Sequence, residues 1–245
     1  MALKSINPYD GSLIASYDQV SEEELEVLLN KSASQWVEWR ATPFNKRKSL
    51  LEEAATILRD RKEQYAALIT REIGKTINES RGEVEKCAWV CEYYAENAQR
   101  FLSSEEVATE YYNAKVDYQP LGPILAVMPW NFPFWQVFRF AAPNLMAGNV
   151  AILKHASNAT GCSLAIQQLF HDAGFPEGTF LSLLLRGSET SKLISDSRIA
   201  GVTLTGSTMA GKAVAEAAGK NIKKSVLELG GSDPYLILED ADIDL

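Results

Sequence analysis

The stretch GPILAVMPWNFP, residues 122–133, decides the fold because it carries an apolar strand into a corner bounded by two prolines. The run Ile124–Met128 has the length of a buried strand, and an amphipathic helical pattern begins directly after the corner. Open α/β sheets bind their ligands at strand-to-helix corners of this kind. Pro129 and Pro133 restrict the backbone around Asn131, whose amide could then donate a hydrogen bond to an oxygen that gains negative charge. A rigid aromatic turn packed on the core explains the corner equally well.

From this corner onward, strand and helix patterns alternate. Strands are expected at Ile124–Met128, Val150–Lys154, Thr179–Leu184, Gly201–Thr205 and Ser225–Leu229. Helices are expected between them at Phe134–Met146, Thr160–Ala173, Thr190–Ser195 and Met209–Gly219. Apolar strands alternating with amphipathic helices predict an α/β fold with a doubly wound parallel sheet, covered on both faces. Residues 121–245 are therefore expected to form a Rossmann-like core.

The first part of the chain has helical patterns instead. Residues 1–105 are expected to be helical, with Ser21 and Asn45 capping the first two helices. A longer helical pattern runs from Ile77 to Phe101. It contains Cys87 and Cys91 one turn apart, a spacing that suits helix packing better than a redox or metal pair.

Two further segments show strand patterns. Residues 106–120 alternate apolar and polar side chains, which predicts a protruding hairpin that turns near Asn113-Ala114. Tyr235–Leu238 has the pattern of another strand, and an acidic helix start follows it. The chain therefore stops at the beginning of an element, which suggests that the natural protein continues past Leu245.

The composition narrows the class of protein. The chain has 245 residues, of which 46% are hydrophobic and 23% charged, as in soluble globular proteins. A net charge of -8 argues against nucleic-acid binding, and no apolar run is long enough for a membrane span. The N-terminus lacks a signal-peptide pattern, and three cysteines without framework spacing favour a cytoplasmic location. With two histidines and no Cys/His cluster, no metal site is expected.

A second corner of the core has the pattern of a phosphate site. Gly206-Ser207 follows an expected strand and opens a helix, where backbone N–H groups can bind a phosphate. The segment nearly matches a P-loop, but Ala213 follows Lys212 where a magnesium-binding hydroxyl would stand. It also lacks the Gly-x-Gly-x-x-Gly dinucleotide pattern, so a helix that merely starts at a glycine is the alternative.

Polar side chains gather at the same expected sheet edge. Lys154 ends the strand after the corner, and Glu228 ends the last one beside two glycines. A partly desolvated carboxylate there suits a general base, because burial raises its pKa; an ordinary ion pair is the alternative. Trp135 and Arg139 follow Asn131 at a spacing of four, so they should share a helix face toward it. Arg139 would suit a substrate carboxylate, unless it is only structural.

Taken together, these motifs resemble the aldehyde dehydrogenase superfamily over essentially the whole chain, from Asn7-Pro8 to the Leu227–Gly231 run. The resemblance implies that Asn131 stabilises the thiohemiacetal oxyanion and that Glu228 activates water to hydrolyse a thioester. It also implies that Leu229 lies against the nicotinamide. The remaining cofactor contacts that it implies involve Met128, Trp130, Asn131, Lys154, His155, Ala156, Ser157, Gly206 and Ser207.

Two departures from the family pattern bear on the cofactor and the subgroup. The family usually has Pro, a small residue and Glu after the lysine, whereas this chain has His155-Ala156-Ser157. The family's glutamate holds ribose hydroxyls and disfavours a 2′-phosphate. Ser157 removes that charge, and a protonated His155 could assist, so NADP should be accepted as well as NAD. Ser232 replaces a lysine common in relatives, which points to a particular subgroup.

The resemblance also implies what this chain lacks. The family's nucleophilic cysteine follows the glutamate by a few dozen residues, whereas Cys87, Cys91 and Cys162 all precede Glu228. The cysteine domain is thus expected beyond Leu245, and residues 1–245 alone should oxidise no aldehyde. Succinate-semialdehyde dehydrogenases carry an arginine where Arg139 stands, and Trp135 would line the aldehyde tunnel beside it.

The expected reaction is oxidation of succinate semialdehyde to succinate with NAD or NADP. A generalist or betaine-type aldehyde dehydrogenase is one alternative. A non-catalytic dinucleotide-binding module is the other. Apart from the aldehyde, the expected partner is a second copy of the chain, because the 106–120 hairpin resembles the family's oligomerisation hairpin and implies a homodimer or homotetramer.

Overall fold

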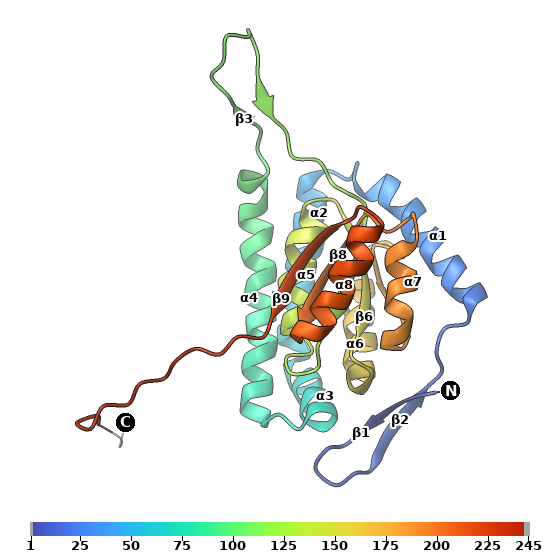
Figure 1. Cartoon of the computed structure of the whole chain (residues 1–245), viewed down its shortest axis with the longest axis vertical. Helices are drawn as coiled ribbons and strands as arrows, with labels where there is room; N and C mark the ends of the chain where they lie inside the picture. The colour runs from blue at the N-terminus through green and yellow to red at the C-terminus, as the bar shows by residue number, and fades with distance from the viewer. Residues whose placement is uncertain (1, 243–245) are drawn as a thin grey trace.

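A five-stranded sheet forms the centre of the computed structural model, which describes residues 2–242 (Figure 1). The strands lie in the order β7 (Phe180–Ser182), β6 (Val150–His155), β5 (Pro123–Met128), β8 (Gly201–Gly206) and β9 (Lys224–Leu229), and every pairing is parallel. The chain builds outward from β5 to β7 and then returns to the other side of β5. The strand order therefore reverses between β5 and β8, where such sheets open a crevice for ligands.

Helices pack against both faces of the sheet. One face packs against α5 (Trp135–Met146) and α6 (Thr160–Asp172), with α2 (Phe44–Asp60), α3 (Lys62–Ile73) and α4 (Ile77–Phe101) as an outer layer. The other face packs against α1 (Glu22–Trp39), α7 (Thr190–Ser195) and α8 (Thr208–Lys220). The 3-10 turns Ser157–Ala159 and Gly187–Glu189 lead into α6 and α7.

Alternation along β5 feeds both hydrophobic cores. Ile124 and Ala126 face the α5 side, whereas Leu125 faces the α1 side, and all three are buried. Coverage is incomplete at β9, where Val226 is 60% exposed. The expectation of full coverage on both faces is therefore wrong for this edge strand of the described chain.

A buried carboxylate from the outer helical layer caps α6. Glu72 of α3 is 2% exposed and accepts hydrogen bonds from the N–H groups of Gly161 (2.9 Å) and Cys162 (2.8 Å). The hydroxyl of Ser5 donates to the same carboxylate at 2.5 Å. Negative charge at a helix N-terminus is favourable because the first N–H groups lack partners within the helix. Glu72 thus fixes α6 and joins the N-terminal segment to the core.

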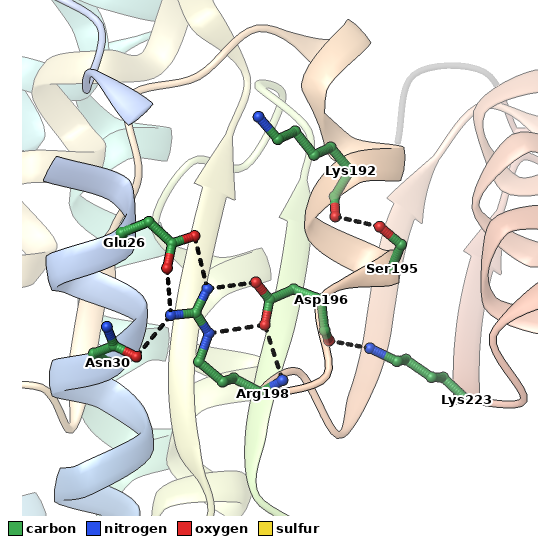
Figure 2. Close-up of polar contacts among 7 residues, drawn as sticks. All are labelled: Glu26, Asn30, Lys192, Ser195, Asp196, Arg198 and Lys223. Atoms are coloured by element: carbon green, nitrogen blue, oxygen red, sulfur yellow. Dashed lines mark hydrogen bonds and ion pairs between the residues drawn. The ribbon is translucent and has the colours of Figure 1, made fainter. Parts of the chain in front are cut away.

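An arginine ties α1 to the loop that enters β8 (Figure 2). All five N–H bonds of the Arg198 guanidinium point at acceptors: the carboxylates of Glu26 and Asp196 and the amide oxygen of Asn30, at 2.5–3.0 Å. This arrangement holds the pKa of Asp196 below its usual value, mainly through the hydrogen bond from Arg198. Lys223, just before β9, donates to the backbone oxygen of Asp196 (Figure 2). The cluster therefore links α1, β8 and β9.

The N-terminal part departs from the all-helical prediction. Strands β1 (Leu3–Ile6) and β2 (Leu13–Tyr17) form an antiparallel hairpin, because Asn7 and Gly11 close a turn between them. Asn45 is not a cap, since α2 already begins at Phe44. The Ser21 capping box and the helix Ile77–Phe101 are confirmed.

Of the two predicted strand segments outside the core, one forms a short hairpin and the other forms no strand within the described residues. A hairpin does project beyond the helices, but β3 (Glu105–Glu106) and β4 (Lys115–Val116) have two residues each (Figure 1). It reverses at residues 109–112 and not at 113–114. The predicted strand Tyr235–Leu238 is wrong: its side chains are 61–90% exposed and no described strand pairs with it. A turn at 239–240 replaces the expected helix start within the described residues.

Candidate active site

The carboxyl ends of three neighbouring strands meet in one cleft. Its walls comprise the corner after β5, the first turns of α5, and the ends of β8 and β9; the lining residues are Pro129, Trp130, Asn131, Gln136, Arg139, Thr205, Gly206, Ser207, Glu228, Leu229 and Gly230. These residues lie on both sides of the point where the strand order reverses. Seven of the predicted site residues are therefore brought together here: Trp130, Asn131, Arg139, Gly206, Ser207, Glu228 and Leu229.

The corner after β5 presents polar and aromatic side chains to solvent. Asn131 is exposed and makes no side-chain hydrogen bond within residues 2–242. Trp130 and Phe132 on either side of it are 52% and 43% exposed. The amide of Asn131 is thus free to donate to a ligand in the cleft.

The corner after β8 opens α8. Ser207 is the N-cap of this helix, and its hydroxyl oxygen accepts a hydrogen bond from the N–H of Ala210 at 3.2 Å. The other N–H groups of the first turn have no partner within the helix, so this end of α8 can receive an anion. Behind it, Leu229 lies close to Gly211, where an added Cβ would stand 2.4 Å from a Leu229 methyl carbon.

The two charged residues of the cleft contact each other. Arg139 Nη2 lies 2.9 Å from Glu228 Oε1, and the side chains are 40% and 52% exposed. About half of the Glu228 side chain is exposed, because β9 lies at the uncovered edge of the sheet, so within the described chain the predicted desolvation is only partial. The prediction that Arg139 points toward the cleft does agree with its position.

The segment Lys154–Ser157 is divided between two faces of the sheet. Lys154 follows Ile152 on the α1 side, whereas His155 follows Leu153 on the α5 side. Lys154 is 8% exposed, and burial lowers its pKa while the nearby Glu189 opposes that effect. Ser157 is exposed at the start of the turn before α6. None of these residues lines the cleft.

His155 is a buried neutral residue, and the prediction that it assists a phosphate when protonated is wrong. It is 5% exposed; Nδ1 accepts from the N–H of Ala156 at 2.8 Å, and Nε2 lies 2.9 Å from the carbonyl oxygen of Pro133. These partners require the tautomer with the proton on Nε2. Burial lowers the pKa of His155 to about 4, so the ring carries no charge near neutral pH.

Three other predicted contacts do not line the cleft. Met128 is 4% exposed and belongs to the core on the α5 side, and it also lines an adjoining cavity that reaches Arg139 and Glu228. Ala156 donates its N–H to His155. Trp135 lies under Lys86 of α4, whose Nζ is 4.0 Å from the ring centroid. Trp135 does not line this cleft, whereas Gln136 and Arg139 do, so its place beside the aldehyde stays a prediction.

Glu83 and Lys75 support the corner, and no motif in the sequence marks either residue as part of the site. Glu83 accepts from the N–H groups of Phe134 (2.8 Å) and Trp135 (3.0 Å), although 51 and 52 positions separate them. Lys75 Nζ lies 2.5 Å from Glu83 and 3.5 Å from the centroid of the Phe132 ring. Only the packing of α4 against α5 brings these residues to the corner.

Residues 2–242 contain no group of three acidic, cysteine or histidine side chains that could hold a metal ion. No helix within the same residues is long and apolar enough to cross a membrane. All three cysteines are buried, and burial raises the pKa of each thiol, most clearly for Cys87 and Cys162. None of them lines the cleft.

Comparisons with known proteins agree on one family. The family model described as "Aldehyde dehydrogenase family" matches residues 1–245. A probable NADP-dependent succinate-semialdehyde dehydrogenase of Synechocystis sp. is 52% identical over 244 residues, which is 100% of this chain and 54% of that protein. An Escherichia coli succinate semialdehyde dehydrogenase named for NAD(P) is 46% identical over 98% of this chain and 52% of its own length.

A solved structure shows the same architecture. The succinic semialdehyde dehydrogenase of Streptococcus pyogenes, in complex with NADP, superimposes with a TM-score of 0.95 at 39% identity. The match covers 99% of this chain and 54% of that one. The chain therefore spans about half the length of the relatives that it matches.

Proposed function

The chain belongs to the aldehyde dehydrogenase family, and we propose that it forms the cofactor-binding half of an enzyme that oxidises succinate semialdehyde to succinate with NAD or NADP. The observation that carries the proposal is the cleft in which Asn131, Arg139 and Glu228 converge at the end of the sheet. The nucleophile is a cysteine supplied by residues after Leu245.

The residues of the cleft suit the successive steps of this reaction. Asn131 donates its amide N–H to the oxyanion that forms when the cysteine attacks the aldehyde. The bound cofactor supplies the hydride acceptor. Glu228 then removes a proton from the water that hydrolyses the thioester. Leu229 would lie against the nicotinamide, and Trp130, which also lines the cleft, would contribute to holding the cofactor.

Three features of the chain fit a dinucleotide. The N-terminus of α8, at Gly206-Ser207, borders the cleft and suits the pyrophosphate. Lys154 supplies a cation near the end of β6, the strand beside β5. The exposed Ser157 offers a hydroxyl without a repelling charge. Ser157 thus supports acceptance of NADP, the cofactor named for two of the relatives above. His155 has no part in this binding, because both its ring nitrogens are occupied.

Arg139 provides the basis for the choice of substrate. Its guanidinium already binds a carboxylate, that of Glu228, at the wall of the cleft. The carboxylate of succinate semialdehyde has the same chemistry and would replace Glu228 as partner, which frees Glu228 for its own step. Charge-assisted contacts of this kind contribute about 1.5–3 kcal/mol each.

The experiment is substitution of Arg139 by methionine in the full-length protein. We expect KM for succinate semialdehyde to rise about 10- to 150-fold, with a change below about threefold for hexanal, which has no carboxylate. A matched control is Arg186→Met, which removes an arginine that does not line the cleft. Equal losses for both aldehydes would show that Arg139 is structural and would favour a generalist or betaine-type dehydrogenase.

The reading frame beyond Leu245 tests the enzyme itself. A cysteine some tens of residues after Glu228 is expected there, and its replacement by alanine should abolish formation of reduced cofactor. If no such cysteine exists, the chain is instead part of a dinucleotide-binding module without catalytic function.

We also infer that the projecting hairpin joins subunits into a homodimer or homotetramer. Tyr111 and Tyr112 at its tip are 73% and 106% exposed, and β3–β4 stands clear of the helices (Figure 1). Large apolar side chains on a projection of this kind suit burial against another subunit.

A further inference from the structure

We propose that Lys75, Glu83 and His155 are positioning residues that hold the 129–133 corner and thereby aim the amide of Asn131 into the cleft. This inference rests on the proposed function, in which Asn131 stabilises the oxyanion. It assigns a role in the reaction to three side chains that lie behind the corner and do not line the cleft.

Glu83 fixes the downstream end of the corner. Its side chain is fully buried, and Oε1 accepts from the N–H groups of Phe134 and Trp135 at 2.8 and 3.0 Å. These are the first N–H groups of α5, and no local side chain caps them. A charged acceptor at this place sets where α5 begins and how the chain enters it.

Lys75 connects the same carboxylate to the middle of the corner. Its Nζ lies 2.5 Å from Glu83 Oε2, and its side chain is only 11% exposed. The same ammonium stands 3.5 Å from the centroid of the Phe132 ring, directly after Asn131. A cation held over an aromatic face by a buried carboxylate restricts the position of that ring.

His155 supports the corner from the sheet. Nε2–H donates to the carbonyl oxygen of Pro133 at 2.9 Å, and the N–H of Ala156 holds the ring through Nδ1 at 2.8 Å. His155 pairs in register with Met128, the last residue of β5. His155 thus contacts both ends of the corner: its ring binds Pro133, and its backbone position pairs with Met128.

These supports matter because Asn131 has none of its own. Its side chain makes no hydrogen bond within the described residues, so the backbone of the corner alone determines where the amide points. Oxyanion stabilisation depends on donors that are already oriented before the reaction. A displacement of about 1 Å can lower a rate about a hundredfold, even when its cause lies away from the chemistry.

The test is a double-mutant cycle on kcat in the full-length protein. Asn131→Ala should lower kcat about 10²- to 10³-fold. Glu83→Gln, which keeps the shape and loses the charge, should lower kcat about tenfold with KM for the cofactor nearly unchanged. If Glu83 acts through Asn131, the double variant should fall less than about twofold below Asn131→Ala.

Glu72→Gln is the matched control, because Glu72 is also a buried carboxylate that caps a sheet-covering helix, yet it contacts α6 and not the corner. In the double variant, the fold-losses in kcat caused by Glu72→Gln and by Asn131→Ala should multiply. If the effects of Glu83→Gln and Asn131→Ala also multiply, or if Glu83→Gln leaves kcat unchanged, the positioning role is refuted while the proposed function stands. Unchanged kcat in Asn131→Ala would instead overturn the oxyanion role itself.

Substitutions of His155 keep the test decisive if Glu83→Gln does not fold. Glutamine can place an amide N–H near the position of Nε2, whereas leucine fills the space without a donor. We expect His155→Gln to retain kcat within about threefold and His155→Leu to lose about tenfold, with the loss again absent in the Asn131→Ala background. Equal kcat for the two variants would refute the role of the His155 donor.

Discussion

The buried imidazole of His155 should make the protein's stability depend on pH, and His155→Gln should remove that dependence. In the folded chain the pKa of His155 is about 4, because burial opposes the charged form, against 6.5 for a free imidazole. Protonation of Nδ1 would also place a second donor opposite the N–H of Ala156. The unfolded chain therefore binds a proton at a pH where the folded chain does not.

The sign and size of the effect follow from this difference in pKa. Above about pH 6.5 both states are neutral and the stabilising contribution is fully present. As the pH falls, the unfolded state gains a proton first, so the free energy of unfolding decreases until the folded state titrates near 4. The complete loss is about 3 kcal/mol, of which about 2 kcal/mol should be lost between about pH 7 and about pH 5.

Urea unfolding at these two pH values measures the effect. Carboxylates also titrate in this range, but their contribution is common to both proteins and cancels when His155→Gln is subtracted from the parent. His171→Gln serves as control, because it removes the other histidine, whose side chain is 59% exposed, and should retain the pH dependence due to His155. If the free energy of unfolding changed equally with pH in the parent and in His155→Gln, a buried neutral imidazole at this position would be refuted.

Two further substitutions test other parts of the chain. Ser157→Glu places a carboxylate at the exposed start of the turn before α6, and it should lower the NADP-to-NAD ratio of kcat/KM at least about tenfold; an unchanged ratio would remove Ser157 from the cofactor site. Glu72→Ala leaves three donors without their buried acceptor and should lower the free energy of unfolding by about 3–5 kcal/mol. Glu24→Ala at the exposed Ser21 cap should lower it less. Equal losses of the two variants in urea unfolding would contradict the importance of burial.

Local signals in the sequence predict several helices and strands correctly. The helix Ile77–Phe101 agrees at both ends, since Thr76 and Glu79 form a capping box at its start. The run Ile124–Met128 is likewise found as β5, extended by one residue. Tyr235–Leu238 fails because an apolar run becomes a strand only when a neighbouring strand accepts its hydrogen bonds, and none does so within the described residues.

Contacts between distant segments explain why two of the predicted site residues do not line the cleft. His155 has the composition of a phosphate contact, but its position on β6 turns it toward Pro133, 22 residues earlier. Trp135 has the right spacing to face the cleft with Arg139, yet Glu83 and Lys86 of α4 hold this part of α5 from the other side. Spacing along one helix cannot reveal which neighbour that helix will have.

The position of the predicted cofactor residues also shows why a single cleft does not contain them all. They follow four neighbouring strands, β6, β5, β8 and β9, and adjacent strands lie about 4.8 Å apart. The distance across the sheet from Lys154 on β6 to Glu228 on β9 is therefore about 14 Å. A compact ligand could contact only part of this edge, whereas a ligand with two separated ends could bind Lys154 and Ser157 at one end and Leu229 at the other. The absence of Lys154 and Ser157 from the cleft is therefore compatible with a dinucleotide, and it makes Ser157→Glu a test of one end that should leave the chemistry at Asn131 intact.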